Sequence, residues 1–320
     1  MIDRKTRDAL IAEDPKSAEI LKPWADGVSV QKWREESSDL FVILFPKGWT
    51  DKTCNPVDED EAEAKLAARF PAIWNHLSKH RESARNRSDK GTYWWELRAC
   101  AYYDKLEAPK ILYRDISSGP TFSLERSGKI NDTTSYFIPS DSAFLLGLLN
   151  SGALWFTLLS QTTVARGGYY RFKAQYIETL PIPPATDAQK AELADLAARA
   201  QTAAEARYAL QQAITRRIPD LATANASTGL ARTGVKLTER LKAWWDLPDF
   251  AAFQAEVKKA LKSDIPLTDR NDWENWIADN RTKIHALSAE IARIEREINA
   301  KVYALFDLTP EEIELLEANI

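Results

Sequence analysis

The chain has 320 residues, a formal net charge of −4 and two cysteines, a composition typical of a soluble protein with about two domains. No apolar run reaches the roughly 20 residues that cross a bilayer, and the N-terminus lacks the apolar core of a signal peptide. Cys54 and Cys100 are not spaced for a disulfide framework or a zinc site. These features predict a cytoplasmic protein with no membrane contact, held together by its core.

The first half of the chain alternates helical and strand-like segments. Apolar periodicity predicts a short helix at 9–13, a buried strand at 40–45 and a helix over 59–79 that is interrupted or kinked near Pro71. Aromatic and branched residues favour strands at 93–97, 109–113 and 135–138. Helical patterns follow over 143–150 and onward to residue 160. We therefore expect a mixed α/β domain over residues 1–185.

The character of the sequence changes after Pro184. Residues 187–217 are rich in alanine and predict a long helix, which Thr186 or Asp187 would cap. A loop of small residues at 219–234 and a helical insert at 237–262, broken near Pro248, precede the longest helix, over about 272–303. That helix has heptad-like spacing at Ile277, Ile284, Leu287, Ile291, Ile294 and Ile298. The prediction is an α+β chain whose residues 186–320 form a helical region, with the two long helices packed as an antiparallel pair.

Positive charge is concentrated locally, although the chain as a whole is acidic. Between Lys65 and Arg114, eleven Lys or Arg face five Asp or Glu. Arginine and lysine bind phosphates, arginine forks onto guanine, and tyrosine stacks or donates to phosphates. A solvated surface of mixed charge remains the alternative for any one of them. The candidate DNA-binding residues are Lys32, Arg85, Arg87, Lys90, Arg98, Lys110, Arg114, Arg166, Tyr169, Tyr170, Arg171 and Lys173.

Patterns for bond-breaking chemistry are missing from the sequence. A methyltransferase needs a glycine-rich turn for S-adenosylmethionine and, for amino groups, an Asn-Pro-Pro-Tyr motif, but Asn55-Pro56 continues with Val57. The P-loop and Gly-x-Ser-x-Gly patterns do not occur either. We therefore expect no catalytic, cofactor-binding or metal-binding residues in this chain.

Two enzymatic alternatives and one structural alternative stay open at this point. Asp249, Glu256 and Lys258 imitate the Pro-Asp…Glu-x-Lys signature of metal-dependent nucleases, but they fall in an amphipathic helical pattern. His76 and His80 lie one helical turn apart, which could suit a metal, without an evident third ligand. The long helices could instead make the chain a protein-interaction scaffold.

Several motifs, taken in order, resemble a known family. They are Ser17, Lys22-Pro23, Gly27, Val30–Trp33, Phe70–Leu77, Arg87–Arg98, Pro109–Tyr113, Leu148–Ser151, Arg166–Tyr170, Leu180–Pro183 and Val302–Ile313. This order is similar to the C-terminal target recognition domain of TaqI-like and Eco57I-like adenine-N6 DNA methyltransferases and type IIG restriction–modification enzymes.

The resemblance implies a domain or subunit that reads a short double-stranded DNA sequence. It would position a methyltransferase or nuclease catalytic domain or subunit, and S-adenosylmethionine would bind in that catalytic part. The family's catalytic motifs lie in an N-terminal region that has no counterpart in this sequence.

Overall fold

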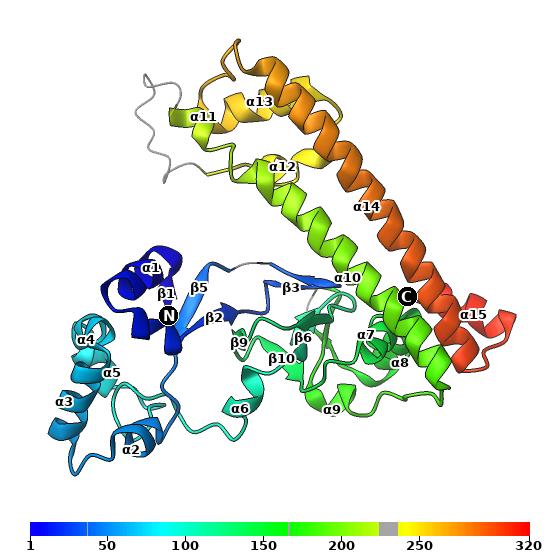
Figure 1. Cartoon of the computed structure of the whole chain (residues 1–320). Coiled ribbons are helices and arrows are strands. Elements are labelled where there is room, and N and C mark those ends of the chain that lie inside the picture. The colour runs from blue at the N-terminus through cyan, green and yellow to red at the C-terminus, as the bar shows by residue number, and fades with distance from the viewer. Residues whose placement is uncertain (37, 166, 224–235) are drawn as a thin grey trace. The chain divides into compact units, whose positions relative to one another are not determined.

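A computed structural model describes residues 1–36, 38–165, 167–223 and 236–320 (Figure 1). It confirms the α+β class. The chain divides into two compact units, which we call the α/β unit (1–142 with 154–181) and the helical unit (143–153 with 182–320). Residues 143–153 belong to the helical unit, whereas the sequence predicts that the whole stretch 1–185 forms one domain. The physical reason is close packing at Gly147, where an added Cβ would lie 3.1 Å from a Leu193 side-chain carbon.

A four-stranded sheet organises the N-terminal part of the α/β unit. Its order is β1-β5-β2-β9, in which β2 and β9 are parallel and the other neighbours are antiparallel. The helix that follows β1 begins where the Asp3 side chain accepts a hydrogen bond from the Thr6 amide. The elements are β1 (Ile2–Asp3), α1 (Arg4–Glu13), η1 (Pro15–Glu19), β2 (Leu21–Ala25), β5 (Leu40–Ile43) and β9 (Ile130–Asn131).

A group of short helices packs on an aromatic core next in the chain. Phe45, Leu66 and Phe70 are fully buried there. The predicted helix over 59–79 is confirmed with its interruption, because Phe70 ends one helix and Pro71 starts the next. These helices are α2 (Trp49–Cys54), α3 (Glu59–Arg69), α4 (Pro71–Ser78), α5 (Arg81–Arg85) and α6 (Tyr103–Leu106).

The predicted strand at 93–97 is wrong. This segment consists of turns, with one isolated bridge between Lys90 and Leu97. The Trp95 indole donates to the Thr50 hydroxyl at 2.9 Å, and the buried Glu96 carboxylate accepts from the backbone amides of Thr50 and Thr92 at 3.0 Å. Side chains that bond to loops in this way hold the segment in turns, although its composition favours a strand.

Two three-stranded antiparallel sheets and a hairpin complete the α/β unit. One sheet has the order β10-β6-β8 and the other β11-β12-β7. The predicted strands near 109–113 and at 135–138 are confirmed as β6 and β10. The elements are β3 (Val30–Gln31), β4 (Arg34–Glu35), β6 (Lys110–Arg114), β7 (Ile116–Ser117), β8 (Ser123–Glu125), β10 (Ser135–Ile138), β11 (Val164–Ala165), β12 (Tyr169–Arg171) and α9 (Ala174–Ile177). The helix α8 (Gly152–Gln161) precedes β11.

Two long helices dominate the helical unit (Figure 1). Thr186 and Gln189 form a capping box at the start of the first. Ion pairs join Glu192 to Lys301 and Arg199 to Glu290, so the contact positions rise along one helix as they fall along the other, and the pair is antiparallel. The elements are α7 (Ala143–Leu149), α10 (Asp187–Thr215), α11 (Asp220–Thr223), α12 (Glu239–Lys242), η3 (Trp244–Asp246), α13 (Phe250–Leu261), α14 (Arg270–Leu305) and α15 (Pro310–Glu317).

The predicted apolar stripe of α14 faces the core except at one position. Leu287 is half-buried, whereas Ile277, Ile284, Ile291, Ile294 and Ile298 are buried. Of the loop predicted at 219–234, residues 220–223 form the short helix α11, and 224–235 lie outside the described residues. Within the described chain no single helix is long and apolar enough to cross a membrane. The helices α7 and α8 are together long and apolar enough to cross a membrane, but the chain bends by 59° between them.

Candidate nucleic-acid interface

The hairpin of β11 and β12 carries predicted DNA-binding residues with exposed side chains. Two glycines shape its turn, because Gly167 and Gly168 have φ of 80° and 79°, a left-handed conformation that other residues rarely adopt. The predicted Arg166 lies outside the described residues. An added Cβ at Gly168 would meet no atom within 4 Å.

Side chains on β12 alternate between the surface and the core. Tyr169 is 46% exposed and Arg171 is exposed, whereas Tyr170 lies edge-on to the Trp155 ring at 5.3 Å. Trp155 in turn stacks on Phe172 at 5.7 Å. The rings beneath β12 fix the strand, so its outward side chains project from a packed base.

Asp115 ties two of the predicted cations to this sheet. Its carboxylate accepts from the Lys173 ammonium at 2.9 Å and lies 3.9 Å from the Arg171 guanidinium. Lys173 also donates to the Tyr136 hydroxyl at 2.9 Å, and these hydrogen bonds with Tyr136 and Asp115 raise the pKa of Lys173. The structure therefore brings Arg171 and Lys173 together around one carboxylate.

Lys110 is a correction to the predicted DNA-binding set. Its side chain is fully buried, and its ammonium donates to Glu125 at 2.8 Å and to the Leu106 carbonyl at 2.5 Å. Burial disfavours the charged Glu125 carboxylate, but hydrogen bonds from Lys110 and Ser127 outweigh burial and lower the pKa of Glu125. With this environment Lys110 braces β6 against β8 and cannot reach a duplex in this fold.

Two more predicted cations are half-buried and bound to backbone carbonyls. Arg114 donates to the carbonyls of Val30 and Val28, at 2.5 and 2.9 Å, and burial lowers the pKa of its guanidinium. Arg87 donates to the carbonyls of Trp94 and Glu96, at 2.9 and 3.1 Å. Both guanidinium groups therefore stabilise the backbone of neighbouring segments, which is a structural role.

The remaining predicted residues lie apart from β12, on other elements. Arg85 on α5 pairs with Glu59 and Glu63, and the Lys90 ammonium donates to the Arg85 carbonyl at 2.6 Å. Lys32 occupies a turn, and Arg98 lies in an irregular segment. The Lys32 ammonium lies 5.8 Å from the centre of the Trp33 ring, and the Arg98 side chain is exposed.

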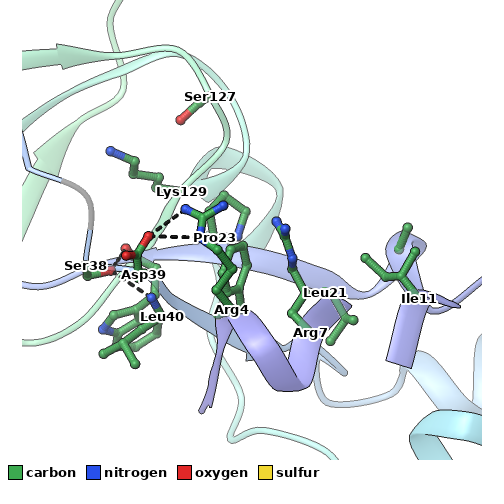
Figure 2. Close-up of a pocket in the computed structure, with 13 residues that line it drawn as sticks. Arg4, Arg7, Ile11, Leu21, Pro23, Ser38, Asp39, Leu40, Ser127 and Lys129 are labelled. Carbon is green, nitrogen blue, oxygen red and sulfur yellow. Dashed lines mark hydrogen bonds and ion pairs between the residues drawn. The ribbon is translucent and has the colours of Figure 1, made fainter. Parts of the chain in front are cut away.

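A pocket that sequence analysis missed lies at the four-stranded sheet. Its volume is about 430 Å³, and cations reach it from separate segments, namely Arg4 and Arg7 on α1 and Lys129 before β9 (Figure 2). The Arg7 guanidinium lies 4.3 Å from the centre of the Phe41 ring, and Arg4 pairs with Asp39 (Figure 2). These segments come together through the pairing of β1, β2, β5 and β9. Sequence analysis missed the pocket because no local motif predicts that pairing.

The residues that suggested a nuclease or metal site have structural partners. Glu256 is buried on α13 and accepts from the Thr238 hydroxyl at 2.9 Å and from Arg240 at 3.2 Å. Asp249 caps the same helix by accepting from the Ala252 amide. The His76 and His80 rings are 5.6 Å apart, and the described residues contain no group of three or more possible metal ligands.

Comparison with known proteins finds family models that match each half of the chain. Residues 186–302 match a domain of unknown function, DUF8810. A stretch of 142 residues is 29% identical to the type II methyltransferase M.XhoI of Xanthomonas vasicola, covering 42% of this chain and 26% of that protein. Residues 30–182, which contain all the predicted DNA-binding residues, match the model of the TaqI-like C-terminal specificity domain. Over residues 30–182 this chain is therefore similar to TaqI-like C-terminal specificity domains.

Proposed function

We propose that the chain recognises a short double-stranded DNA sequence on behalf of a type II restriction–modification DNA methyltransferase. The match of residues 30–182 to a specificity domain is the observation that carries this proposal. The similarity to M.XhoI, a type II methyltransferase, supports it. The exposed Arg171 and Tyr169 supply side chains that can reach base edges and phosphates.

In this proposal the chain binds DNA and another part of the system performs the chemistry. A catalytic domain or subunit would hold S-adenosylmethionine and methylate a base flipped out beside the recognised sequence. The glycine-rich turn that approaches that cofactor is missing from this sequence. The purified chain should therefore neither retain S-adenosylmethionine in equilibrium dialysis nor methylate DNA, and methylation by the chain itself would contradict this division.

Selection from a pool of randomised duplexes tests the DNA-binding proposal. The wild-type chain should enrich one short sequence, and its affinity for that duplex should fall steeply with salt because cations on the protein displace counterions from phosphates. Arg171→Ala should weaken binding to the selected duplex by roughly 1–3 kcal/mol. An assembly surface made by the helical pair would instead bind a protein and show little dependence of DNA binding on sequence.

A matched control separates a base contact from a loss of charge. Arg216 at the end of α10 is exposed like Arg171 but belongs to the helical unit. Arg216→Ala should leave the affinity for the selected duplex unchanged. Failure of the wild-type chain to enrich any sequence would overturn the proposed function.

A further inference from the structure

We propose that Ile116 and Arg171 form a cross-strand pair that reads a thymine and a guanine in neighbouring base steps of the major groove. Arg171 would bind guanine O6 and N7, and Ile116 would contact the C5 methyl group of thymine. This inference rests on the proposed function and deepens it, because it names the feature of DNA that the β12 sheet recognises.

Strand register places the two side chains next to each other. Arg171 on β12 lies directly opposite Ile116 on β7, so both point to the same face of the sheet. Ile116 is 41% exposed, and the Arg171 side chain is 44% exposed. Directly opposed residues have Cβ atoms about 5 Å apart, while stacked base pairs are separated by about 3.4 Å. Two such side chains can therefore reach adjacent steps of one duplex.

At β7 and β12, the opposite face of the sheet packs on the protein itself. Tyr170 is paired with Ser117, which is buried, and Tyr170 lies against Trp155. Tyr169, two residues before Arg171, shares the outward face. The strands β7 and β12 thus offer one packed face and one open face, and the open face combines a guanidinium, an aromatic ring and a branched apolar side chain.

Asp115 makes Arg171 suited to reading a base. The carboxylate lies 3.9 Å from the guanidinium, close enough to orient it, while its hydrogen bond of 2.9 Å goes to Lys173. Arg171 therefore keeps donors for a forked contact with guanine. Asp115 directly precedes Ile116, so one short segment sets the positions of both members of the pair.

The tip of the hairpin permits close approach to DNA. A major groove about 12 Å wide admits a two-stranded ribbon. Gly167 and Gly168 in the turn carry no side chain, and added Cβ atoms there would meet at most Tyr169, at 3.9 Å from Gly167. A single exposed isoleucine is ordinary on a protein surface. Its position directly across from an oriented arginine indicates base reading.

Base analogues test the pair on the sequence that the wild-type chain selects. Uracil in place of each thymine removes only the C5 methyl group, and 7-deazaguanine in place of each guanine removes only the N7 acceptor. At one thymine we expect uracil to weaken wild-type binding about fourfold, the value of one buried methyl group. At an adjacent guanine, the deaza analogue should weaken binding about tenfold.

The variants identify which side chain reads which base. Ile116→Ala should bind the thymine and uracil duplexes equally, and Arg171→Ala should no longer distinguish guanine from its deaza analogue. Val164→Ala is the matched control, because Val164 is exposed in the same sheet but pairs with Tyr170 on the other face. That variant should retain both discriminations.

The analogue measurements on the wild-type chain require no variant to fold. The inference is overturned if no thymine position responds to loss of its methyl group, if Ile116→Ala still distinguishes uracil, or if the responding thymine and guanine are not adjacent. A wild-type chain that selects a sequence and gives one of these results leaves the proposed function standing. A chain that selects no sequence overturns both.

Discussion

Lys110 on β6 and Arg171 on β12 carry the same charge in the same domain, and their surroundings are opposite. Lys110 is enclosed between Glu125 and the Leu106 carbonyl, with no exposed surface. Arg171 stands on the outward face of its sheet, 3.9 Å from Asp115. The first position strengthens the fold and the second is available to a partner. Charge by itself therefore does not identify a DNA contact.

The comparison extends to the other predicted cations. Arg87 and Arg114 resemble Lys110 in having a structural role. Their guanidinium groups donate to backbone carbonyls of other segments and so connect those segments. Arginine presents several donors in a fixed fork, which lets one side chain hold two carbonyls as readily as one phosphate. A domain built from short strands and turns needs such cross-links, and they use the same residue types as DNA binding does.

Removal of Lys110 should give the largest effect on stability. Lys110→Ala leaves the Glu125 carboxylate buried with its main counter-charge missing, so we expect the free energy of unfolding to fall by about 3–5 kcal/mol. Denaturant unfolding of the full chain measures this loss. Arg171→Ala, measured in the same way, should stay within about 0.5 kcal/mol of the wild type, as is usual for surface substitutions.

A double variant sharpens the assignment of Lys110. Replacing both partners with apolar residues, in Lys110→Met with Glu125→Leu, removes the unpaired charge and should recover most of the lost stability. If the single variant were as stable as the wild type and bound DNA less well, Lys110 would belong to the interface after all.

The regular elements of this chain are predictable because their signals are local. The stripe Ile277, Ile284 and Ile291 and the cap at Thr186 indicate α14 and the start of α10 from sequence, and the structure has both. The segment 93–97 was not predictable in this way. Its strand-like composition is overridden by two hydrogen bonds with Thr50, a residue more than 40 positions away. The Trp95 indole donates to the Thr50 hydroxyl, and the Glu96 carboxylate accepts from the Thr50 amide.

The site was predictable in composition and only partly in geometry. The sequence predicts Tyr169 and Arg171 as DNA-binding residues, and the structure exposes both side chains. Ile116 was not a candidate, because its relation to Arg171 is a matter of strand pairing between segments 55 residues apart. The burial of Lys110 depends likewise on its pairing with Glu125 across β6 and β8.

Lowering the pH should reduce the free energy of unfolding by a smaller amount than Lys110→Ala does. The pKa of Glu125 is below its ordinary value of 4.5 in the folded chain, so the unfolded chain binds this proton more tightly. The stabilisation is therefore present above about pH 4.5 and is lost as the pH falls through the folded-state pKa. Between pH 6 and 3, we expect the free energy of unfolding to fall less steeply in Glu125→Gln than in the wild type. Equal slopes would show that Glu125 does not contribute to acid sensitivity.

The smallest effect is expected at Arg85, which tests the boundary of the interface. Its guanidinium already pairs with Glu59 and Glu63, and Glu63 also pairs with Arg81, so Arg85→Ala leaves no acid buried without a partner. Exposed ion pairs of this kind contribute at most about 1 kcal/mol. We therefore expect Arg85→Ala to change neither the unfolding midpoint appreciably nor the dependence of DNA affinity on salt. A reduction of the salt slope by about one would instead mean that Arg85 exchanges its carboxylates for a phosphate when DNA binds, and the interface would then extend from β12 to α5.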